Sequence, residues 1–390
     1  MRPVLIGTVL LSIAAAYYIY LPLPSTISEP WKLMFMDALI RGMMKLSFLA
    51  HDLGLTSPFG LAKYYSAGAK SIESSPSVRV TEACFGGVEA LVFESAAAGQ
   101  EQSFKRGVVY FHGGGWTLDK AADCHSKVRI TSSPRFTKRY NDVFQASKHI
   151  LTSEVLGRYS IDLKRVAVSG DSAGGNLAAA VAQQVALDSS IPIKFKVQAL
   201  VYPALQALDF NTPSYQQNAN MPILDRPMMA RFWLEYLNGE QKLVPALLAN
   251  NHTALDQGQE IAAAKAKTDW TKLLPVAFQK SYKPVFPLHG DPKLLEKLPG
   301  LLDVRAAPLL AETKVLKAVP PAYIMTCEHD VLRDDGLMYA TRLEEAGVDV
   351  TVDHFEDGFH GCLSFAFGPF AFSVGRRSLG NYIHWLKENL

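Results

Sequence analysis

The sequence predicts an α/β fold in which helices cover both faces of a mostly parallel sheet. Short apolar runs typical of strands alternate with helical patterns along most of the 390 residues. Hydrophobic residues make up 48% of the chain and charged residues 19%, which gives enough apolar material for a core and is unlike a disordered protein. The length fits one large α/β domain or two ordinary ones.

Charge and cysteine content exclude several classes of function. The net charge is only +2 and no long block of Lys or Arg occurs, so we do not expect nucleic acid as a partner. The four cysteines are widely spaced and form no metal-ligand pair, so we expect neither a metal nor a cofactor. One disulfide bond remains possible, and the spacing does not determine which two cysteines form it: Cys84, Cys124, Cys327 or Cys362.

The first residues predict a membrane anchor. Val4 to Tyr20 carries no charge and has about the length, roughly 17–20 residues, that spans a bilayer core as a helix. Arg2 precedes this run and Glu29 is the first charge after it. Because the positively charged end of a membrane helix stays on the cytoplasmic side, we expect the body of the protein in the lumen. We therefore predict a transmembrane signal-anchor in residues 1–24. A cleaved signal peptide is the alternative, because residues 14–16 are small alanines.

The residues just after the apolar run favour the anchor. Aromatic side chains collect at membrane interfaces, and here they are Tyr17, Tyr18 and Tyr20. Both alternatives send the rest of the chain to the secretory lumen. Asn251 begins the sequon Asn-His-Thr and is therefore a candidate glycosylation site.

Strand and helix patterns follow in order along the rest of the chain. Apolar runs of strand length are bounded by glycine, proline or polar segments, and Gly86-Gly87 predicts a hairpin between the first two. The expected strands are Val78 to Cys84, Val88 to Phe93, Gly107 to Phe111, Val166 to Val168, Lys196 to Tyr202, Ala322 to Cys327 and Val348 to Phe355. The expected helices are Pro30 to Ala50, Asn141 to Tyr159, Leu177 to Leu187, Asp335 to Ala346 and Gly380 to Leu390.

Two regions are candidates for a cap over the site. Residues 205–300 interrupt the strand–helix alternation and follow a sheet strand, so we expect cap elements there and at about 25–75. Simple surface decoration is the alternative. The helix Pro30 to Ala50 is interpreted as an amphipathic helix packed on a core. The other interpretation is a lid that touches lipid, because the helix contains Met34, Phe35, Met36, Met43, Met44 and Phe48.

Residues 165–177 carry the most informative pattern. The apolar run Val166 to Val168 ends in Gly-Asp-Ser-Ala-Gly, residues 170–174, and a helical stretch follows at once. A strand, a tight Gly-x-Ser-x-Gly turn and a helix form the nucleophile elbow of α/β hydrolases. Such a turn projects the serine hydroxyl clear of the sheet, and the helix points its positive end at the place where an oxyanion forms. We therefore predict Ser172 as a nucleophile, although five residues alone are a weak pattern.

Acyl transfer also requires hydrogen-bond donors for the oxyanion of the tetrahedral intermediate. A glycine-rich turn follows the strand that ends at Phe111, and backbone N–H groups in such a turn can approach a ligand closely. We predict that the oxyanion hole consists of Gly113, Gly114, Gly115 and Ala173. The alternative is a glycine-rich turn without a role.

The base and the acid are predicted from chain order. The order in α/β hydrolases is serine, acid, histidine, and His360 follows the last strand between two glycines. Asp330 follows the preceding strand and is the predicted acid. Asp334 and Asp335 are expected to begin the next helix instead, since carboxylates suit a helix N-terminus.

With these residues the chain resembles the hormone-sensitive-lipase-like branch of the α/β hydrolases, and within it the family of neutral cholesterol ester hydrolase and arylacetamide deacetylase. The resemblance covers nearly the whole chain. The motifs that carry it are His112 to Trp116, Gly170 to Asn176, Phe210 to Asn218, Cys327 to Gly336 and Asp353 to Cys362. It implies a single-pass protein of the endoplasmic-reticulum membrane with a luminal hydrolase domain over residues 25–390. The implied substrates are cholesteryl esters or the acetyl group of ether lipids.

One segment departs from this family. The family carries a further interior strand before the serine turn, whereas residues 117–140 contain no comparable apolar run. That strand would lie next to the one leading to His112, and losing it could cost more than the roughly 5–15 kcal/mol of stability that a domain possesses. Either Lys127 to Thr131 forms a short substitute strand, or the chain folds badly.

The leading hypothesis is a membrane-anchored serine hydrolase that cleaves hydrophobic carboxylic esters. An amidase that acts on aryl acetamides uses the same residues and is one alternative. A catalytically impaired lipid-binding protein is the other, motivated by the missing strand. The complete set of Ser172, Asp330 and His360 argues against the impaired protein. The sequence leaves the oligomeric state open.

Overall fold

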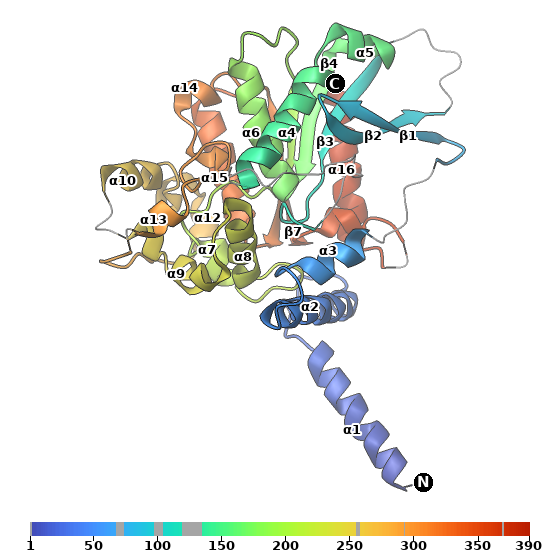
Figure 1. The fold of residues 1–390 in the computed structure, drawn as a ribbon, viewed down its shortest axis with the longest axis vertical. Coiled ribbons are helices and arrows are strands. Elements are labelled where there is room, and N and C mark those ends of the chain that lie inside the picture. Colours follow the sequence, from blue (N-terminus) through green and yellow to red (C-terminus); the bar gives the residue numbers. More distant parts are fainter. Residues whose placement is uncertain are drawn as a thin grey trace.

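The computed structural model describes residues 2–67, 74–96, 104–118, 135–254, 258–291, 293–368 and 370–390. A parallel sheet with the strand order β3-β4-β5-β6-β7 lies at its centre, and β1 and β2 form a separate antiparallel hairpin (Figure 1). The strands are β1 (Val78–Phe85), β2 (Val88–Ser95), β3 (Lys105–Phe111), β4 (Ile161–Asp171), β5 (Val197–Val201), β6 (Ala322–His329) and β7 (Val350–Phe359).

Helices cover the sheet, precede it and fill the long connection between β5 and β6 (Figure 1). Next to the sheet are α4 (Arg135–Ile150), α5 (Ser153–Arg158), α6 (Ala173–Leu187), α15 (Arg333–Glu345) and α16 (Ser373–Asn389), and η4 (Cys362–Phe365) follows β7. The N-terminal helices are α1 (Arg2–Ile19), α2 (Pro30–Asp52) and α3 (Gly60–Ala67). The connection holds α7 (Pro213–Gln217), α8 (Arg226–Leu237), η1 (Gln241–Leu243), α9 (Val244–Leu248), η2 (Asn251–Thr253), α10 (Gln259–Ala266), α11 (Trp270–Leu273), α12 (Val276–Gln279), α13 (Lys293–Lys297), η3 (Pro308–Leu310) and α14 (Thr313–Leu316).

Alternation along the central strands sorts their side chains between the two faces of the sheet. Leu200 of β5 and Ile324 of β6 pack in the core that contains α6 and α15. The next residue of each strand, Val201 and Met325, packs on the opposite face with Tyr382 of α16. Both faces are thus covered, which explains why every residue of β5 and every residue of β6 except Glu328 is buried, as in interior parallel strands.

β3 forms one edge of the described sheet. It pairs in parallel with β4, with Phe111 opposite Gly170, and within the described ranges no strand pairs with its other edge. The predicted lack of an interior strand concerns residues 117–140. Most of that segment, residues 119–134, lies outside the described residues, and so does the candidate substitute strand at 127–131. The missing strand therefore stays a prediction.

Most expected elements are present, but several have different ends. The expected helix Asn141 to Tyr159 is two helices, α4 and α5, because Thr152 interrupts it. The Thr152 side chain accepts a hydrogen bond from the backbone N–H three residues later and so caps the start of α5. The last helix, α16, begins at Ser373 rather than at Gly380, since its first turn also packs behind β7.

α1 projects away from the rest of the molecule (Figure 1). Its apolar side chains are largely exposed, with Leu10 at 61% and Leu11 at 73%. The sequence predicts a transmembrane helix in residues 1–24. However, α1 ends at Ile19, and in the described part of the chain no helix is long and apolar enough to cross a membrane. The transmembrane prediction is therefore not supported.

One apolar cluster joins the two regions that were expected to form a cap. Phe59, between α2 and α3, is fully buried and stacks on Phe232 of α8 with the ring centroids 5.0 Å apart. Trp116, which follows β3, belongs to the same cluster, and so does Ala173 at the start of α6. The cluster therefore lies at the carboxyl ends of β3 and β4, next to the predicted site.

We expect Phe59→Ala to lower the free energy of unfolding by about 3–5 kcal/mol, because it removes a fully buried ring between the N-terminal helices and α8. Tyr64→Ala is the control, since that ring is 82% exposed and its loss should change stability by less than about 0.5 kcal/mol. Denaturant unfolding followed by circular dichroism measures both. Equal effects would contradict the described packing, and a cooperative transition of the parent chain would reject the badly folding alternative.

Candidate active site

Ser172 lies at the turn between β4 and α6 with φ 55° and ψ −117°. Residues other than glycine rarely adopt a positive φ, so the surroundings must hold this turn in place. The Ser172 N–H donates to the Val201 carbonyl of β5 at 2.8 Å. Because α6 begins at Ala173, the positive end of the helix dipole lies directly beside the serine.

Two glycines allow the serine turn to approach the end of β3. A Cβ on Gly174 would overlap the carbonyl groups of Phe111 and His112. A Cβ on Gly170 would overlap the backbone of Gly174 and the Phe111 carbonyl. Both positions therefore require glycine for a close approach, which is the structural cause of the Gly-x-Ser-x-Gly pattern.

The structure brings the three predicted triad residues into one hydrogen-bonded chain. His360 Nε2 lies 2.9 Å from Ser172 Oγ, and His360 Nδ1 lies 2.8 Å from Asp330 Oδ2. Asp330 is fully buried, and its Oδ1 accepts the Leu332 N–H at 2.8 Å. Ser172 and His360 are each 8% exposed. This arrangement can transfer the serine proton to Nε2 while the carboxylate orients the ring through Nδ1.

The loop that carries Asp330 is held from two sides. Asn218, just after α7, donates from Nδ2 to the backbone carbonyls of Glu328 and Asp330 at 2.9 and 3.0 Å. His329 Nε2 lies 2.6 Å from Oγ1 of Thr26, in the segment between α1 and α2. Sequence analysis did not predict either contact, because both partners are far from the loop in the chain.

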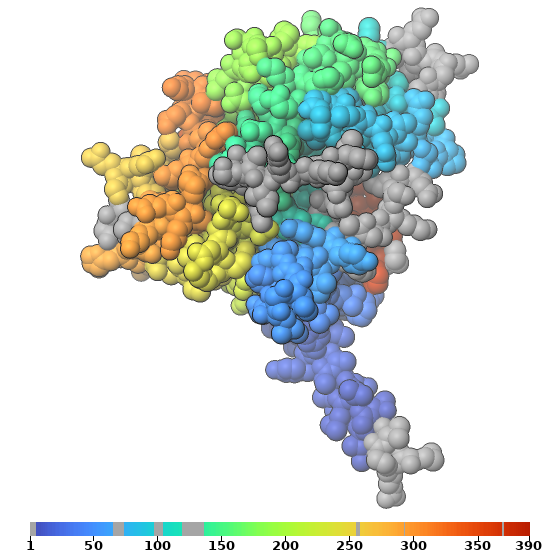
Figure 2. Space-filling model, viewed as in Figure 1, coloured from blue at the N-terminus to red at the C-terminus, as the bar shows by residue number. Residues whose placement is uncertain are grey.

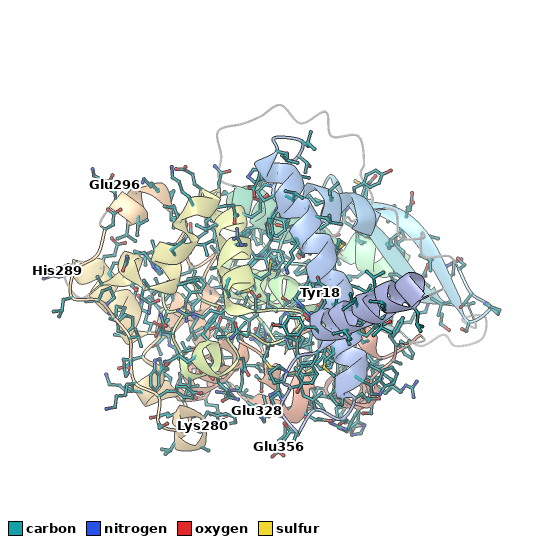
Figure 3. All side chains as sticks on the ribbon, turned by 90° about the horizontal axis from the view of Figure 1, so that it is seen from below. Tyr18, Lys280, His289, Glu296, Glu328 and Glu356 are labelled. Atoms are coloured by element: carbon teal, nitrogen blue, oxygen red, sulfur yellow. The ribbon has the colours of Figure 1, made fainter. Side chains whose placement is uncertain are left out.

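A network of charges supports the same loop. The fully buried guanidinium of Arg333 lies 3.0 Å from Glu328 and 3.0 Å from Asp334. Lys280 adds a contact of 3.1 Å to Glu328, and Figure 3 shows these two residues on the same side of the molecule. Burial alone would raise the pKa of Glu328, but its hydrogen bond with His354 and the charge of Arg333 hold that pKa well below its ordinary value.

Asp334 and Asp335 lie in the first turn of α15, where the sequence placed them. Both are fully buried and bind the chain that follows β5. Asp334 accepts the Ser214 N–H at 2.7 Å, and Asp335 accepts the Leu205 N–H at 2.8 Å. Burial raises the pKa of Asp335 to about 7. These carboxylates therefore connect α15 to the cap and are not part of the hydrogen-bonded triad.

The Gly113 N–H is already used within the protein. It donates to Asp171 Oδ1 at 2.8 Å, and the Tyr110 hydroxyl donates to the same oxygen at 2.8 Å. This corrects the predicted oxyanion hole, because Gly113 has no second N–H to offer an oxyanion. The N–H groups of Gly114, Gly115 and Ala173 remain as candidates.

Asp171 is a site residue that sequence analysis missed. Its carboxylate connects the serine turn, residues 170–174, to the glycine-rich turn at residues 113–115, which we call the glycine loop. Burial raises the pKa of Asp171, although the hydrogen bonds from Tyr110 and Gly113 lower it. It stands immediately before Ser172 in the chain. No local pattern could identify its role, since its partner Gly113 is distant in sequence.

Aromatic side chains of the cap cover the glycine loop. The Trp116 ring stacks on Tyr236 of α8 with the centroids 4.2 Å apart and the planes 4° apart. A Cβ on Gly115 would overlap the ring of Phe232, so the loop and α8 are in direct contact at this glycine. The candidate oxyanion donors therefore lie beneath an apolar, aromatic layer.

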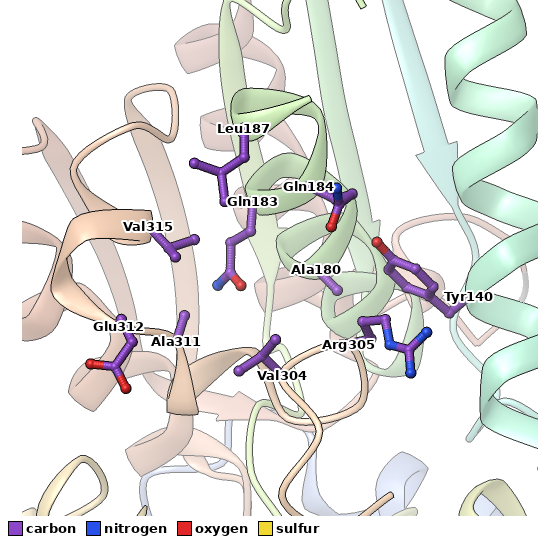
Figure 4. A pocket seen from close by; sticks show the side chains of 10 residues that line it. All are labelled: Tyr140, Ala180, Gln183, Gln184, Leu187, Val304, Arg305, Ala311, Glu312 and Val315. Atoms are coloured by element: carbon purple, nitrogen blue, oxygen red, sulfur yellow. The ribbon is translucent and has the colours of Figure 1, made fainter. Parts of the chain in front are cut away.

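A separate cavity of about 180 Å³ lies between α6 and residues 304–315 (Figure 4). Gln183 and Gln184 line it from α6, and Arg305 and Glu312 line it from the other side. No residue of the triad or of the glycine loop lines this cavity. We therefore do not place an ester substrate in it.

Asn251, the candidate glycosylation site, lies half-buried at the start of η2. The next residue, His252, is fully buried, and the Thr253 hydroxyl donates to the Leu208 carbonyl at 2.9 Å. The sequon is thus part of the folded cap, and its glycosylation stays a prediction.

Comparison with known proteins agrees with the fold and defines the class. A family model described as alpha/beta hydrolase fold matches residues 129–272 and 294–364. A thermostable esterase from Pseudomonas putida is 23% identical with a TM-score of 0.59, over 92% of this chain and 96% of that one. A bacterial heroin esterase is 21% identical with a TM-score of 0.58, over 94% and 98%. The chain is an α/β hydrolase in fold.

Two groups of relatives define the family. Neutral cholesterol ester hydrolase 1 of Mus musculus is 49% identical over 396 residues, which cover 96% of this chain and 97% of that protein. Arylacetamide deacetylase of Oryctolagus cuniculus is 41% identical over 407 residues, which cover 99% and 100%. The chain therefore belongs to the hormone-sensitive-lipase-like family of these two proteins, as its motifs predicted. It is a carboxylic ester hydrolase.

We expect Asp171→Ala to lower kcat by about 10- to 100-fold with a smaller change in KM. Without the carboxylate the glycine loop is displaced, so its N–H groups stabilise the transition state less, whereas binding of the ester changes little. Tyr110→Phe is the matched control, since it keeps the carboxylate and its bond to Gly113, and its kcat should stay within about fivefold. Steady-state hydrolysis of a soluble ester measures both. An unchanged kcat in a folded Asp171→Ala protein would contradict the role of Asp171.

Proposed function

We propose that the protein hydrolyses hydrophobic carboxylic esters with Ser172 as nucleophile, His360 as base and Asp330 as the residue that orients the base. The observation that carries this proposal is the hydrogen-bonded chain from Ser172 Oγ through His360 to Asp330. Oγ attacks the carbonyl carbon while Nε2 accepts its proton, and that proton then leaves with the alcohol. Water, deprotonated by the same imidazole, releases the acid from the acyl-serine.

The tetrahedral intermediates of both steps carry a negatively charged oxygen. We place this oxygen at the N–H groups of Gly114, Gly115 and Ala173, where the N-terminal end of α6 adds a favourable potential. One such donor is typically worth about 3 kcal/mol of barrier. Asp171 contributes indirectly, because it holds the loop through Gly113.

We propose cholesteryl esters as the substrate class, with acetylated ether lipids as a further candidate from the family resemblance. The support is the 49% identity with a protein named neutral cholesterol ester hydrolase 1. The aromatic layer over the glycine loop, formed by Trp116, Phe232 and Tyr236, supports an apolar acyl or alcohol group beside the reacting carbonyl.

Deacetylation of aryl acetamides is the second candidate function. It is favoured by the 41% identity with arylacetamide deacetylase, and the same imidazole can protonate a leaving amine. A lipid-binding protein without catalysis is disfavoured, because the serine, the imidazole and the carboxylate all lie within hydrogen-bond reach of their partners.

We expect a fluorophosphonate probe to label the parent chain and not Ser172→Ala, because only the activated hydroxyl attacks the phosphorus. The same variant should lose at least about 10³-fold in kcat/KM, the residual coming from binding and the oxyanion donors. Comparing kcat/KM for a cholesteryl ester, an acetylated ether lipid and an aryl acetamide ranks the substrate classes. Labelling that persists in Ser172→Ala would reject the nucleophile, and a preference for the acetamide would favour the second candidate.

We also propose that residues 1–24 hold the protein at the endoplasmic-reticulum membrane with the hydrolase domain in the lumen. Supporting observations are the exposed apolar side chains of α1 and the tyrosines at its end, where Tyr17 is 86% exposed and Tyr20 is 66% exposed. Tyrosine and apolar side chains are typical of segments in contact with a membrane interface.

If the hydrolase domain lies in the lumen, we expect Asn251 to be glycosylated. We expect endoglycosidase treatment to increase the gel mobility of the parent protein expressed in mammalian cells, and to leave Asn251→Gln unchanged. Thr253→Ser is the matched control, because it keeps both the sequon and the hydroxyl that binds the Leu208 carbonyl. A parent protein whose mobility does not change with the enzyme would argue against luminal exposure of this sequon.

A further inference from the structure

α2 presents an apolar face to the outside of the molecule. Large apolar side chains recur at helical spacing along α2 and at Leu53, which directly follows it. Each of them is between 39% and 65% exposed: Trp31, Phe35, Leu39, Leu46, Leu49 and Leu53. At about 3.6 residues per turn, these positions fall within roughly 80° of arc around the helix axis. We name this surface the α2 outer face. Soluble monomers rarely expose a continuous apolar patch of this kind without a partner.

Apart from Phe35, whose ring stacks on Phe370 with the centroids 6.1 Å apart, the outer face is not the side of α2 that packs on the protein. Leu33 and Met36 on the inner side join the core around Phe359, close to His360 in the chain. Met44, also on the inner side, joins the cluster that contains Trp116, which follows the glycine loop. α2 is therefore apolar on two sides, and only the inner side is needed for packing beside the active site.

Basic residues border the outer face. Lys45 is exposed at one border. Lys32, at the other, is half-buried, and its ammonium binds Glu29 at 3.1 Å and the Ala371 carbonyl at 3.0 Å. Within α2, all of which the structure describes, no charged residue falls inside the apolar arc. Of the two acidic residues of α2, Asp37 is buried and bound by Arg41, whereas Asp52 is exposed at the end of the helix. An apolar face with an exposed lysine at its border, here Lys45, is typical of helices that lie in a bilayer interface.

A cavity of about 610 Å³ opens at the edge of this face, where α1 meets α2. Its lining includes Tyr17, Tyr18 and Tyr20 together with Arg41 and Lys45. The Arg41 guanidinium lies 4.9 Å and the Lys45 ammonium 5.3 Å from the centre of the Tyr18 ring. Figure 3 shows Tyr18 where α1 passes α2. Tyrosines and cations are the side chains that favour the headgroup layer of a membrane.

We propose that the α2 outer face docks on a phospholipid bilayer, with lipid headgroups at the cavity beside Tyr18. α1 leaves the molecule from this same region (Figure 2), so the exposed apolar side chains of both helices meet one bilayer. The inner side of α2 packs on the cores next to the site, so docking brings Ser172 close to the layer that dissolves an apolar ester. This inference deepens the proposed function and depends on it for its kinetic test.

The kinetic test compares an ester held in a bilayer with a soluble ester. Full-length protein is assayed on cholesteryl oleate in phosphatidylcholine vesicles that contain some phosphatidylserine, and on a soluble nitrophenyl ester. We expect the double variant Leu39→Glu, Leu46→Glu to lower the ratio of the vesicle rate to the soluble rate by about tenfold or more, because two apolar groups no longer enter the bilayer. Leu187→Glu is the matched control, since Leu187 on α6 is 51% exposed and should leave the ratio unchanged.

A second measurement reports docking without catalysis. Leu46→Cys is labelled with an environment-sensitive fluorophore in a Cys84→Ser, Cys124→Ser background, and Leu187→Cys is labelled in the same way. We expect the emission of the Leu46 label to shift to the blue when vesicles without any ester are added, because the label enters an apolar layer. The label at Leu187 should not shift.

Each outcome decides between the proposals. Docking by α2 is overturned if the double variant leaves the rate ratio unchanged, or if the Leu46 label does not respond to vesicles. Either result is also what we expect if α1 alone holds the protein at the vesicle. A Leu46 shift that appears without vesicles and grows with protein concentration overturns it in favour of a second copy of the chain. A parent protein that hydrolyses neither ester overturns the proposed function instead, and the fluorescence still reports docking.

Discussion

The site depends on how closely the end of β3 approaches the serine turn. Phe111 stands opposite Gly170 in the register of β3 and β4, and no side chain fits between the Phe111 carbonyl and Gly174. A methyl group at either glycine would push the loop that follows β3 away from Ser172. Catalytic geometry here begins as a contact between backbones, in which sheet pairing sets the positions and the absence of side chains permits them. The positive φ of the serine turn persists because the surrounding strands hold it.

Buried carboxylates then fix the loops that backbone contact alone would leave loose. Asp171 joins the serine turn to Gly113, and Asp330 joins the loop after β6 to His360. Removing a carboxylate from water is unfavourable unless donors replace the lost hydration. Asp171 receives an N–H and a hydroxyl, and Asp330 receives the Leu332 N–H as well as the imidazole. The same hydrogen bonds that compensate burial are the ones that position the loops.

Local signals and distant contacts explain what the sequence could and could not predict. The sheet strands and the serine turn were predictable, because apolar runs and glycine spacing are visible within about a dozen residues. Chain order then selected Asp330 and His360. The role of Asp171 and the unavailability of the Gly113 N–H were not predictable, since the three glycines of the loop look alike until tertiary structure brings one of them to the carboxylate. The helix break at Thr152 was missed because the apolar pattern continues across it.

The pairing of β3 decides how much a missing strand would matter to the site. β4 occupies one edge of β3, so the strand that the family resemblance predicts would lie against the other edge. The contacts that bring the glycine loop to the serine turn, Phe111 against Gly174 and Gly113 with Asp171, run between β3 and the end of β4. The remaining contacts of the loop described above are with α8 and not with the outer edge of β3. The geometry around Ser172 therefore does not require a strand on the outer edge. The sheet itself does benefit from one, because unpaired backbone groups on an edge strand invite association with other chains. A missing strand would accordingly weaken stability and solubility before it displaced the catalytic residues.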